Sequence, residues 1–162
     1  MLKDLYNKLL DVDFDAIFIN VVNSKIVLDS INSLNIIQIY DKGILSDNSK
    51  IRRLGENYSD YSVSYKNYKI ELGRYQGYVD LSLSGVFLET LNVTYQEHKI
   101  LIEFGGYQVD GGNLADILRA SYSNKIEGLT EENFNKLCNE IILPNLQSAY
   151  YEALKRAFYA AK

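Results

Sequence analysis

Residues able to do nucleophilic or metal chemistry are scarce in this chain. It has one histidine, His98, and one cysteine, Cys138. A His/Cys metal cluster needs several such ligands, so these two residues cannot supply one. A Cys–His dyad would require Cys138, on an apolar helical stretch, to meet a histidine in a predicted turn between strands. We therefore expect a solvated His98, a structural Cys138, no catalytic residue and no metal site.

Two glycine pairs flank a tetrapeptide without matching a phosphate-binding pattern. They are Gly105-Gly106 and Gly111-Gly112. A dinucleotide fingerprint needs Gly-x-Gly-x-x-Gly between a strand and a helix, and a phosphate loop needs Gly-Lys followed by Ser or Thr. The spacing here meets neither pattern, and no serine stands in the Gly-x-Ser-x-Gly pattern of a nucleophile elbow. We expect a turn here and no cofactor.

Paired carboxylates could in principle supply a general acid and a general base. Asp13 with Asp15 and Glu131 with Glu132 are such pairs. Each pair also stands where a helix is predicted to begin, and carboxylates are stabilised there by the helix dipole in any protein. We therefore expect no enzyme. An enzyme whose carboxylates cannot be recognised in the sequence stays the weakest of three alternatives.

Length and composition bound the fold and its partners. A chain of 162 residues, 47% apolar and 23% charged, predicts one globular domain spanning residues 1–162. The net charge of −4 weighs against an autonomous nucleic-acid binder, because affinity for phosphate comes from clustered Lys and Arg. No apolar run approaches the ~20 residues of a membrane span, so we expect no membrane partner.

The N-terminal third of the chain reads as helix. Leucines in residues 2–10 recur at helical spacing, Asp13 offers an N-cap, and a second helix is predicted from Phe14 to Ser24. The apolar residues of this second segment also fit a buried strand. A third helical run continues to Tyr40 and stops at Gly43. We treat residues 1–34 as a helical N-terminal arm.

Residues 44–78 lose this periodicity and form a tyrosine-rich loop excursion. Such a long excursion in a small domain is usually functional. Tyrosine is enriched at protein interfaces because it buries a large area and keeps a polar group. The predicted subunit or partner interface therefore consists of Tyr58, Tyr61, Tyr65, Tyr68, Tyr75, Tyr78, Arg52 and Arg53.

Two other readings of the tyrosines stay open. The rings could pack over the chain's own sheet. They could also stack on single-stranded nucleic acid, which requires interleaved positive charge. Lys66, Lys69 and Arg74 lie nearby, but Glu56 and Asp60 are among the acids that offset them.

The rest of the chain predicts a small sheet followed by helices. Alternation from Val79 to Leu83 predicts a strand, residues 86–91 a short helix, and residues 93–96 with 100–104 a hairpin. The sheet thus spans 79–104. Helices are expected over 113–160, one starting at residue 114 and one at the N-cap Thr130, with a kink or a division near Pro144. The fold class is α+β, with N-terminal helices, a small antiparallel sheet, and C-terminal helices packed on the sheet.

The order of features between residues 35 and 150 resembles a known family. The chain reads Tyr-Asp-Lys-Gly-Ile at 40–44, Leu-Gly-Glu-Asn-Tyr-Ser-Asp-Tyr-Ser-Val-Ser-Tyr-Lys at 54–66, and Val-Asp-Leu-Ser-Leu-Ser-Gly-Val-Phe-Leu-Glu-Thr-Leu-Asn-Val at 79–93. Gly-Leu-Thr-Glu-Glu at 128–132 is similar to the step that opens the family's last helix. This pattern resembles the tail-completion or virion-morphogenesis proteins of tailed bacteriophages, the neck and tail-terminator adaptors.

The resemblance implies a structural virion protein with no enzymatic activity. Copies of such a subunit form a homo-oligomeric ring at the head–tail connector or at the end of the tail tube. The other partners would be phage neck, portal or tail proteins, and DNA would pass through the pore without sequence-specific binding. The expected location is the virion, and the host cytoplasm during assembly.

A ring subunit needs two complementary surfaces, because its contacts are heterologous and close by rotation. The tyrosine-rich excursion and the long C-terminal helix are the candidates. The alternative function, from a different class, is a non-enzymatic protein-binding module that grips its partner through the tyrosine-rich surface.

Overall fold

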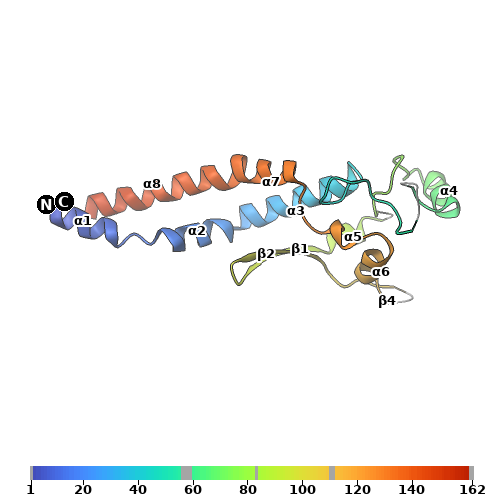
Figure 1. Ribbon diagram of the computed structural model, residues 1–162, viewed down its shortest axis with the longest axis horizontal. Helices are drawn as coiled ribbons and strands as arrows, with labels where there is room; N and C mark the ends of the chain where they lie inside the picture. Colours follow the sequence, from blue (N-terminus) through green and yellow to red (C-terminus); the bar gives the residue numbers. More distant parts are fainter. Residues whose placement is uncertain (1, 56–59, 83, 110–111, 161–162) are drawn as a thin grey trace.

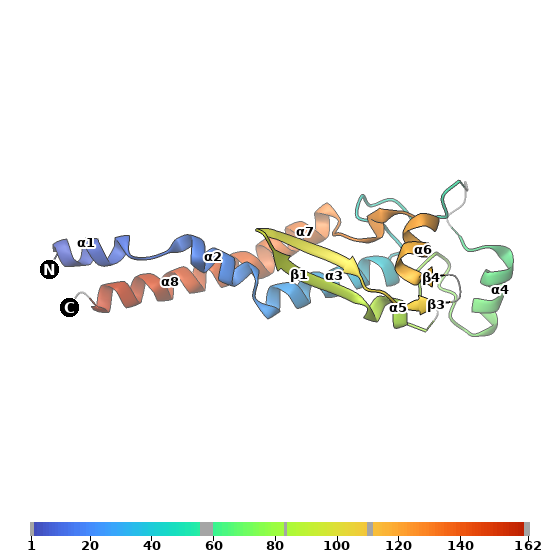
Figure 2. The same cartoon turned by 90° about the horizontal axis from the view of Figure 1, so that it is seen from below.

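Two antiparallel layers of helix form a stalk at one end of the molecule (Figures 1 and 2). The computed structural model describes residues 2–55, 60–82, 84–109 and 112–160. Helices α1 (Leu2–Leu10) and α2 (Phe14–Val22) run along one side of the stalk, and α8 (Leu143–Ala160) returns along the other. The start of α1 and the end of α8 therefore lie together at the free end of the stalk.

The break between α1 and α2 follows from one capping residue. The Asp13 carboxylate accepts a hydrogen bond from the backbone N–H of Ala16 at 2.8 Å, as an N-cap does. Residues 14–22 are helical, so the strand reading of this segment is wrong and the helix prediction is confirmed.

Helix α3 (Lys25–Tyr40) joins the stalk to the head of the molecule. It runs without interruption through residue 34, where the sequence placed the end of the N-terminal arm. Its inner side meets strand β1 (Leu91–Gln96) and helix α7 (Glu131–Leu137) around one set of buried side chains. These are Val27, Ile31, Leu34, Val93 and Leu137. The arm is thus continuous with the core.

Buried amides fasten α3 to the start of α7. The Gln38 side-chain oxygen accepts from the backbone N–H of Thr130 at 2.8 Å and from the Asn133 amide at 3.2 Å. The Gln38 amide donates to the carbonyl of Gly128 at 3.1 Å. Thr130 caps α7 by accepting from the backbone N–H of Asn133, which confirms the predicted N-cap. Because these side chains are buried, breaking any of these hydrogen bonds would leave a polar group without a partner and would lower the free energy of unfolding.

Pro144 divides the C-terminal helices as expected. A π-helical stretch, Cys138–Ile142, separates α7 from α8, and α8 begins at Leu143. Proline has no N–H to donate, and its ring crowds the preceding turn of helix. The wider π-helical turn accommodates the ring, so the helix continues without a sharp break.

A β-hairpin lies along α3. Strand β1 (Leu91–Gln96) pairs antiparallel with β2 (Lys99–Phe104), with Val93 opposite Ile102. Glu97 and His98 form the turn and both have positive φ, the geometry of a two-residue hairpin turn. The predicted hairpin is confirmed.

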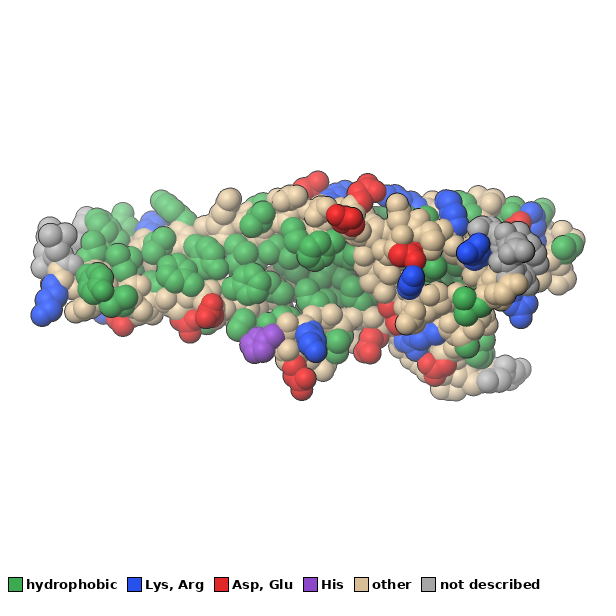
Figure 3. Space-filling view, viewed as in Figure 1, with side chains coloured by type: hydrophobic (Ala, Val, Ile, Leu, Met, Phe, Trp, Pro, Cys, Tyr) green, Lys and Arg blue, Asp and Glu red, His purple; other side chains and the backbone are tan. Residues whose placement is uncertain are grey.

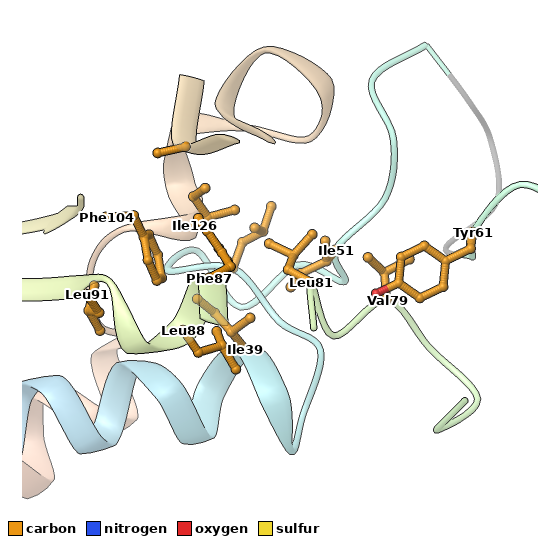
Figure 4. Packing of buried hydrophobic residues seen from close by; sticks show 12 residues of the cluster. Ile39, Ile51, Tyr61, Val79, Leu81, Phe87, Leu88, Leu91, Phe104 and Ile126 are labelled. Atoms are coloured by element: carbon orange, nitrogen blue, oxygen red, sulfur yellow. The ribbon is translucent and has the colours of Figure 1, made fainter. Parts of the chain in front are cut away.

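The head packs short elements around a second core (Figure 4). Phe87 stacks on Phe104 with ring centroids 4.1 Å apart, and Ile39 brings in the end of α3. The carboxylate of Glu127 accepts from the backbone N–H of Phe104 at 2.8 Å, which ties the end of β2 to the segment before α7. The other elements of the head are α4 (Val63–Glu71), α5 (Val86–Glu89), β3 (Gln108–Val109), β4 (Gly112–Asn113), α6 (Leu114–Ser121) and a 3₁₀ turn at Asn124–Ile126.

Two predictions for the head need correction. Residues 79–82 are not a strand: Val79, Asp80, Leu81 and Ser82 are all buried and make irregular backbone, while Leu83 lies outside the described residues. Residues 63–71 of the predicted loop excursion form helix α4. The sheet is therefore the β1–β2 hairpin plus the small β3–β4 pair.

The fold class is α+β, as predicted. The C-terminal helices only partly cover the sheet, since α7 meets the hairpin core whereas α8 packs on α1 and α2. Within the described ranges, no helix has both the length and the apolar character to cross a membrane.

Candidate assembly surfaces

Tyr61, predicted to lie at an interface, is part of a buried charge cluster. Its hydroxyl donates to the Asp80 carboxylate at 2.7 Å and accepts from the backbone N–H of Asp80 at 3.1 Å. The Lys69 ammonium lies 2.5 Å from the same carboxylate oxygen and donates to the carbonyl of Ser82. Tyr61 is 5% exposed, Asp80 1% and Lys69 0%. The prediction for Tyr61 is therefore wrong, because the ring is almost entirely buried and its hydroxyl is used within the chain.

The electrostatics agree with this internal role. Burial raises the pKa of the Tyr61 hydroxyl far above its usual value, and the hydrogen bond to the Asp80 carboxylate raises it further. The Lys69 ammonium also lies 4.7 Å from the centre of the Tyr61 ring, within cation–π range. The cluster fastens α4 to residues 79–82, and its polar groups are occupied by one another.

The hydroxyls of Tyr75 and Tyr78 are also used within the chain. Tyr75 donates to the Asp60 carboxylate at 3.0 Å, and Lys66 pairs with the same carboxylate at 2.6 Å. Burial acts to raise the pKa of Asp60. Hydrogen bonds from Lys66, from the backbone N–H of Tyr61 and from the Tyr75 hydroxyl outweigh this effect, so the pKa is lowered. Tyr78 donates to the backbone carbonyls at the end of α3. Both rings are half-buried.

The remaining predicted tyrosines are partly available. Tyr65 packs edge-on against Tyr61 with centroids 5.0 Å apart, and Tyr68 follows at 6.4 Å from Tyr65. Tyr65 and Tyr68 therefore lie next to each other on α4. Tyr65 is half-buried, so Tyr68 is the ring that solvent reaches most freely; Tyr58 lies outside the described residues. Of the predicted interface tyrosines, Tyr68 fits a partner surface best.

Arg52 and Arg53, the basic members of the predicted interface, lie in a basic depression of the head. Both are exposed and line a depression of about 430 Å³ together with Lys50 and Lys125. Lys125 is engaged by Asp47, whose carboxylate lies 2.7 Å from its ammonium. Arg53 also lines a second depression of about 450 Å³ together with Tyr61 and Tyr65, so this arginine adjoins the predicted tyrosines.

A long exposed apolar surface lies on the stalk. On α8, Leu146, Ala149, Tyr150, Ala153 and Ala157 are buried or half-buried and mark the side that faces α1 and α2. Leu143, Tyr151, Leu154 and Phe158 fall on one flank of that side at helical spacing, and all four are exposed. Helix α8 is therefore apolar over a wider arc than one neighbouring layer covers.

Helix α2 continues this surface. Phe14 meets Tyr150 of α8 edge-to-face with centroids 5.3 Å apart, and Phe18 stands one turn further along α2; both phenylalanines are exposed. Figure 3 shows apolar side chains running almost unbroken along this side of the stalk. We call it the stalk face and define it by Phe14, Phe18, Leu143, Tyr151, Leu154 and Phe158.

The other side of the stalk carries a shallow groove between α2 and α8. It has a volume of about 440 Å³ and combines apolar with small polar side chains. The Asn145 amide already donates to the carbonyl of Ile141 at 2.7 Å. We call this the back groove and define it by Ile17, Asn20, Val21, Ile26, Asn145 and Ala149.

Sequence reasoning nominated the C-terminal helix as a surface but found only half of its pattern. The helical spacing of the sequence places Phe134, Leu154 and Phe158 on one apolar side together with Leu137 and Ala157. Leu137 and Ala157 are buried, whereas the other three are exposed. The signal was the width of the apolar arc, which exceeds the one stripe that a surface helix of a monomer needs.

The residues best suited to chemistry stand on separate elements. His98 is exposed at the hairpin turn, 3.4 Å from the Tyr95 hydroxyl, and Cys138 is a half-buried thiol in the π-turn. Across the described ranges, no group of three or more His, Cys, Asp or Glu side chains could hold a metal ion.

Comparison with known proteins returned no similar protein. The chain matches no family model, no curated protein and no solved structure.

Proposed function

We propose that this chain is a structural, non-enzymatic subunit that assembles with copies of itself. Its finer assignment is a ring at the head–tail connector or at the tail-tube end of a tailed phage. The observation that carries the proposal is the stalk face, an apolar helical surface left uncovered in the isolated chain.

The size of the stalk face supports an assembly role. Its six side chains are each roughly half exposed, and Phe or Tyr carries ~150–250 Å² of area. The exposed apolar area is therefore on the order of 600 Å², at the upper end of the ~300–600 Å² of the largest patch on an ordinary monomer. A patch of this size is often functional, and its helical spacing favours a protein partner.

The head supports a structural role in a different way. The Asp80 carboxylate accepts hydrogen bonds from the ammonium of Lys69 and from the hydroxyl of Tyr61, so these three groups bind one another inside the head. Arg119 likewise pairs with Glu127, which in turn holds the end of β2. These groups act as internal fasteners.

The ring and its place in a virion rest on the resemblance over residues 35–150. The alternative, a binding module with a tyrosine-rich partner surface, has less support. The hydroxyls of Tyr61, Tyr75 and Tyr78 serve the chain itself, which leaves Tyr68 as the main exposed ring.

Two measurements test the proposal. Native mass spectrometry of the purified chain should give one closed oligomer with a defined copy number. Mass spectrometry of phage particles purified from the natural source should find peptides of this chain together with portal and tail proteins. A chain that stays monomeric at high concentration and is absent from particles would contradict the proposal.

A further inference from the structure

We propose that the stalk face of one copy packs into the back groove of the next, so that stalks stand side by side in the assembly. This inference rests on the proposed function insofar as it takes the partner to be a second copy of this chain. It adds which two surfaces meet and the type of symmetry that follows.

The spacing of the stalk face fits helix-to-helix packing. Leu143, Tyr151, Leu154 and Phe158 follow one another at intervals of eight, three and four residues. Side chains at such intervals form the ridges that interdigitate when two helices pack at a small crossing angle. A helix that already packs on α1 and α2 and carries a second ridge is built to lie between two neighbours.

The available area matches a stable contact. Tyr6 and Leu10 on α1 are also exposed, by 62% and 66%. With them, the exposed apolar area of the stalk is on the order of 800 Å², which is about what each partner contributes to a standard protein interface. The contact therefore needs no surface beyond the stalk itself.

The back groove has the chemistry to receive this face. Ile17, Val21 and Ala149 give it an apolar floor, and the Asn145 amide is already satisfied by a backbone carbonyl. Glu152 also lines it, with its charge paired to Lys155 at 3.6 Å. Asn20, Ser24 and Ser148 also line the groove, so the apolar floor is the part that the stalk face covers, and these polar side chains need hydrogen bonds in the contact.

The two surfaces lie on opposite sides of the stalk, and this decides the symmetry. Inward-facing residues of α8 separate the exposed flank with Leu143 from the flank with Asn145. A contact between different patches is heterologous, and repeated contacts of that kind close into a ring when the rotation allows. Face-to-face pairing of two stalk faces would instead stop at a dimer.

Disulfide trapping distinguishes these arrangements. Phe14 lies beside Tyr150 and the two helices are antiparallel, so Asn20 on α2 is level with Leu143 at the start of α8. In a Cys138→Ser background, we would compare Leu143→Cys, Asn20→Cys and the double variant after mild oxidation. The expected result is a ladder of covalent multimers from the double variant alone, with each single variant staying monomeric under denaturing conditions.

Each other outcome overturns the inference. Dimers from Leu143→Cys alone would show that stalk faces meet each other, and no ladder from a folded double variant would show that the two surfaces do not meet. If a closed oligomer still forms without the ladder, the proposed function stands and only this contact fails. Circular dichroism verifies that each variant is folded.

A charge placed on the stalk face gives a second readout. Tyr151 is 65% exposed, so Tyr151→Glu leaves the monomer fold intact and should weaken self-association by about a hundredfold. The control is Val63→Glu at the start of α4, an apolar side chain that is 75% exposed at the end of the molecule opposite the stalk, where we expect less than a twofold change. Equal association of both variants in sedimentation experiments would contradict the inference.

Discussion

Replacing Lys69 by methionine tests the buried charge cluster of the head. Methionine keeps most of the length and volume of the side chain but removes the ammonium. The Asp80 carboxylate then stays 1% exposed with two remaining donors, the Tyr61 hydroxyl and the backbone N–H of Ser82. A buried carboxylate without its cation is the costly product of this change.

The expected loss is large compared with ordinary substitutions. Removing one partner of a buried ion pair costs ~3–5 kcal/mol. A domain of this size has a free energy of unfolding of ~5–15 kcal/mol, so the variant should fold with little margin. With a urea dependence of ~2 kcal/mol per molar, the unfolding midpoint should fall by ~1.5–2.5 M.

Urea unfolding followed by far-UV circular dichroism measures this loss. The control is Lys25→Met, which removes an exposed ion pair with Asp29 and should cost less than ~1 kcal/mol. A Lys69→Met/Asp80→Asn double variant completes a mutant cycle and should recover part of the loss, because the carboxylate is then neutral. Midpoints for Lys69→Met and Lys25→Met that agree within error would refute the buried pair.

Three further predictions follow from single contacts. Tyr61→Phe removes the hydroxyl that donates to the Asp80 carboxylate and accepts from the Asp80 backbone N–H. The free energy of unfolding measured in urea should therefore fall by ~1–3 kcal/mol, whereas an unchanged value would mean that the ring lies at an interface. Gly43→Ala should destabilise by more than ~1 kcal/mol in thermal melts, because φ is +60° and the new methyl group would collide with a tyrosine ring. Hydrogen bonds from Lys125 and from a neighbouring serine hold the pKa of Asp47 well below its usual range. The resulting stabilisation is complete at a pH above the unfolded-state pKa of ~3.9 and is lost as the pH falls toward the lower pKa of the folded state. The melting temperature of Lys125→Met should therefore lie below that of the original chain at neutral pH, and this difference should shrink at about pH 3.

Local signals were enough to predict the N-terminal and C-terminal helices and the hairpin. The Asp13 and Thr130 caps use only residues within one turn, and both form as expected. The hairpin likewise depends on alternation and a two-residue turn at Glu97 and His98. Such features are decided by contacts close in the sequence, which a pattern can report.

The predicted strand at 79–83 failed because of contacts distant in sequence. Alternation of Val79, Asp80, Leu81 and Ser82 predicts one polar face in water, yet all four side chains are buried. Asp80 is buried because Lys69 and Tyr61 supply a cation and a hydroxyl. Nothing in the local pattern shows that a charged residue has such partners.

The candidate site could be predicted only in outline. Tyrosine content drew attention to residues 58–78, but whether a ring faces a partner depends on which acids and carbonyls its hydroxyl reaches. The Tyr75 hydroxyl donates a hydrogen bond to the Asp60 carboxylate, and the Tyr78 hydroxyl donates to a backbone carbonyl at the end of α3. The stalk face required knowledge of which flank of α8 the other helices cover, and that is set by the fold as a whole.

The antiparallel stalk imposes an order on biosynthesis. Helices α1 and α2 leave the ribosome before α8, which carries the residues that cover them, such as Tyr150 beside Phe14. At ~5–20 residues per second, the apolar side of α2 waits on the order of ten seconds for its cover. The nascent chain must therefore shield this segment during translation, by a chaperone or by early contacts of its own, until α8 emerges.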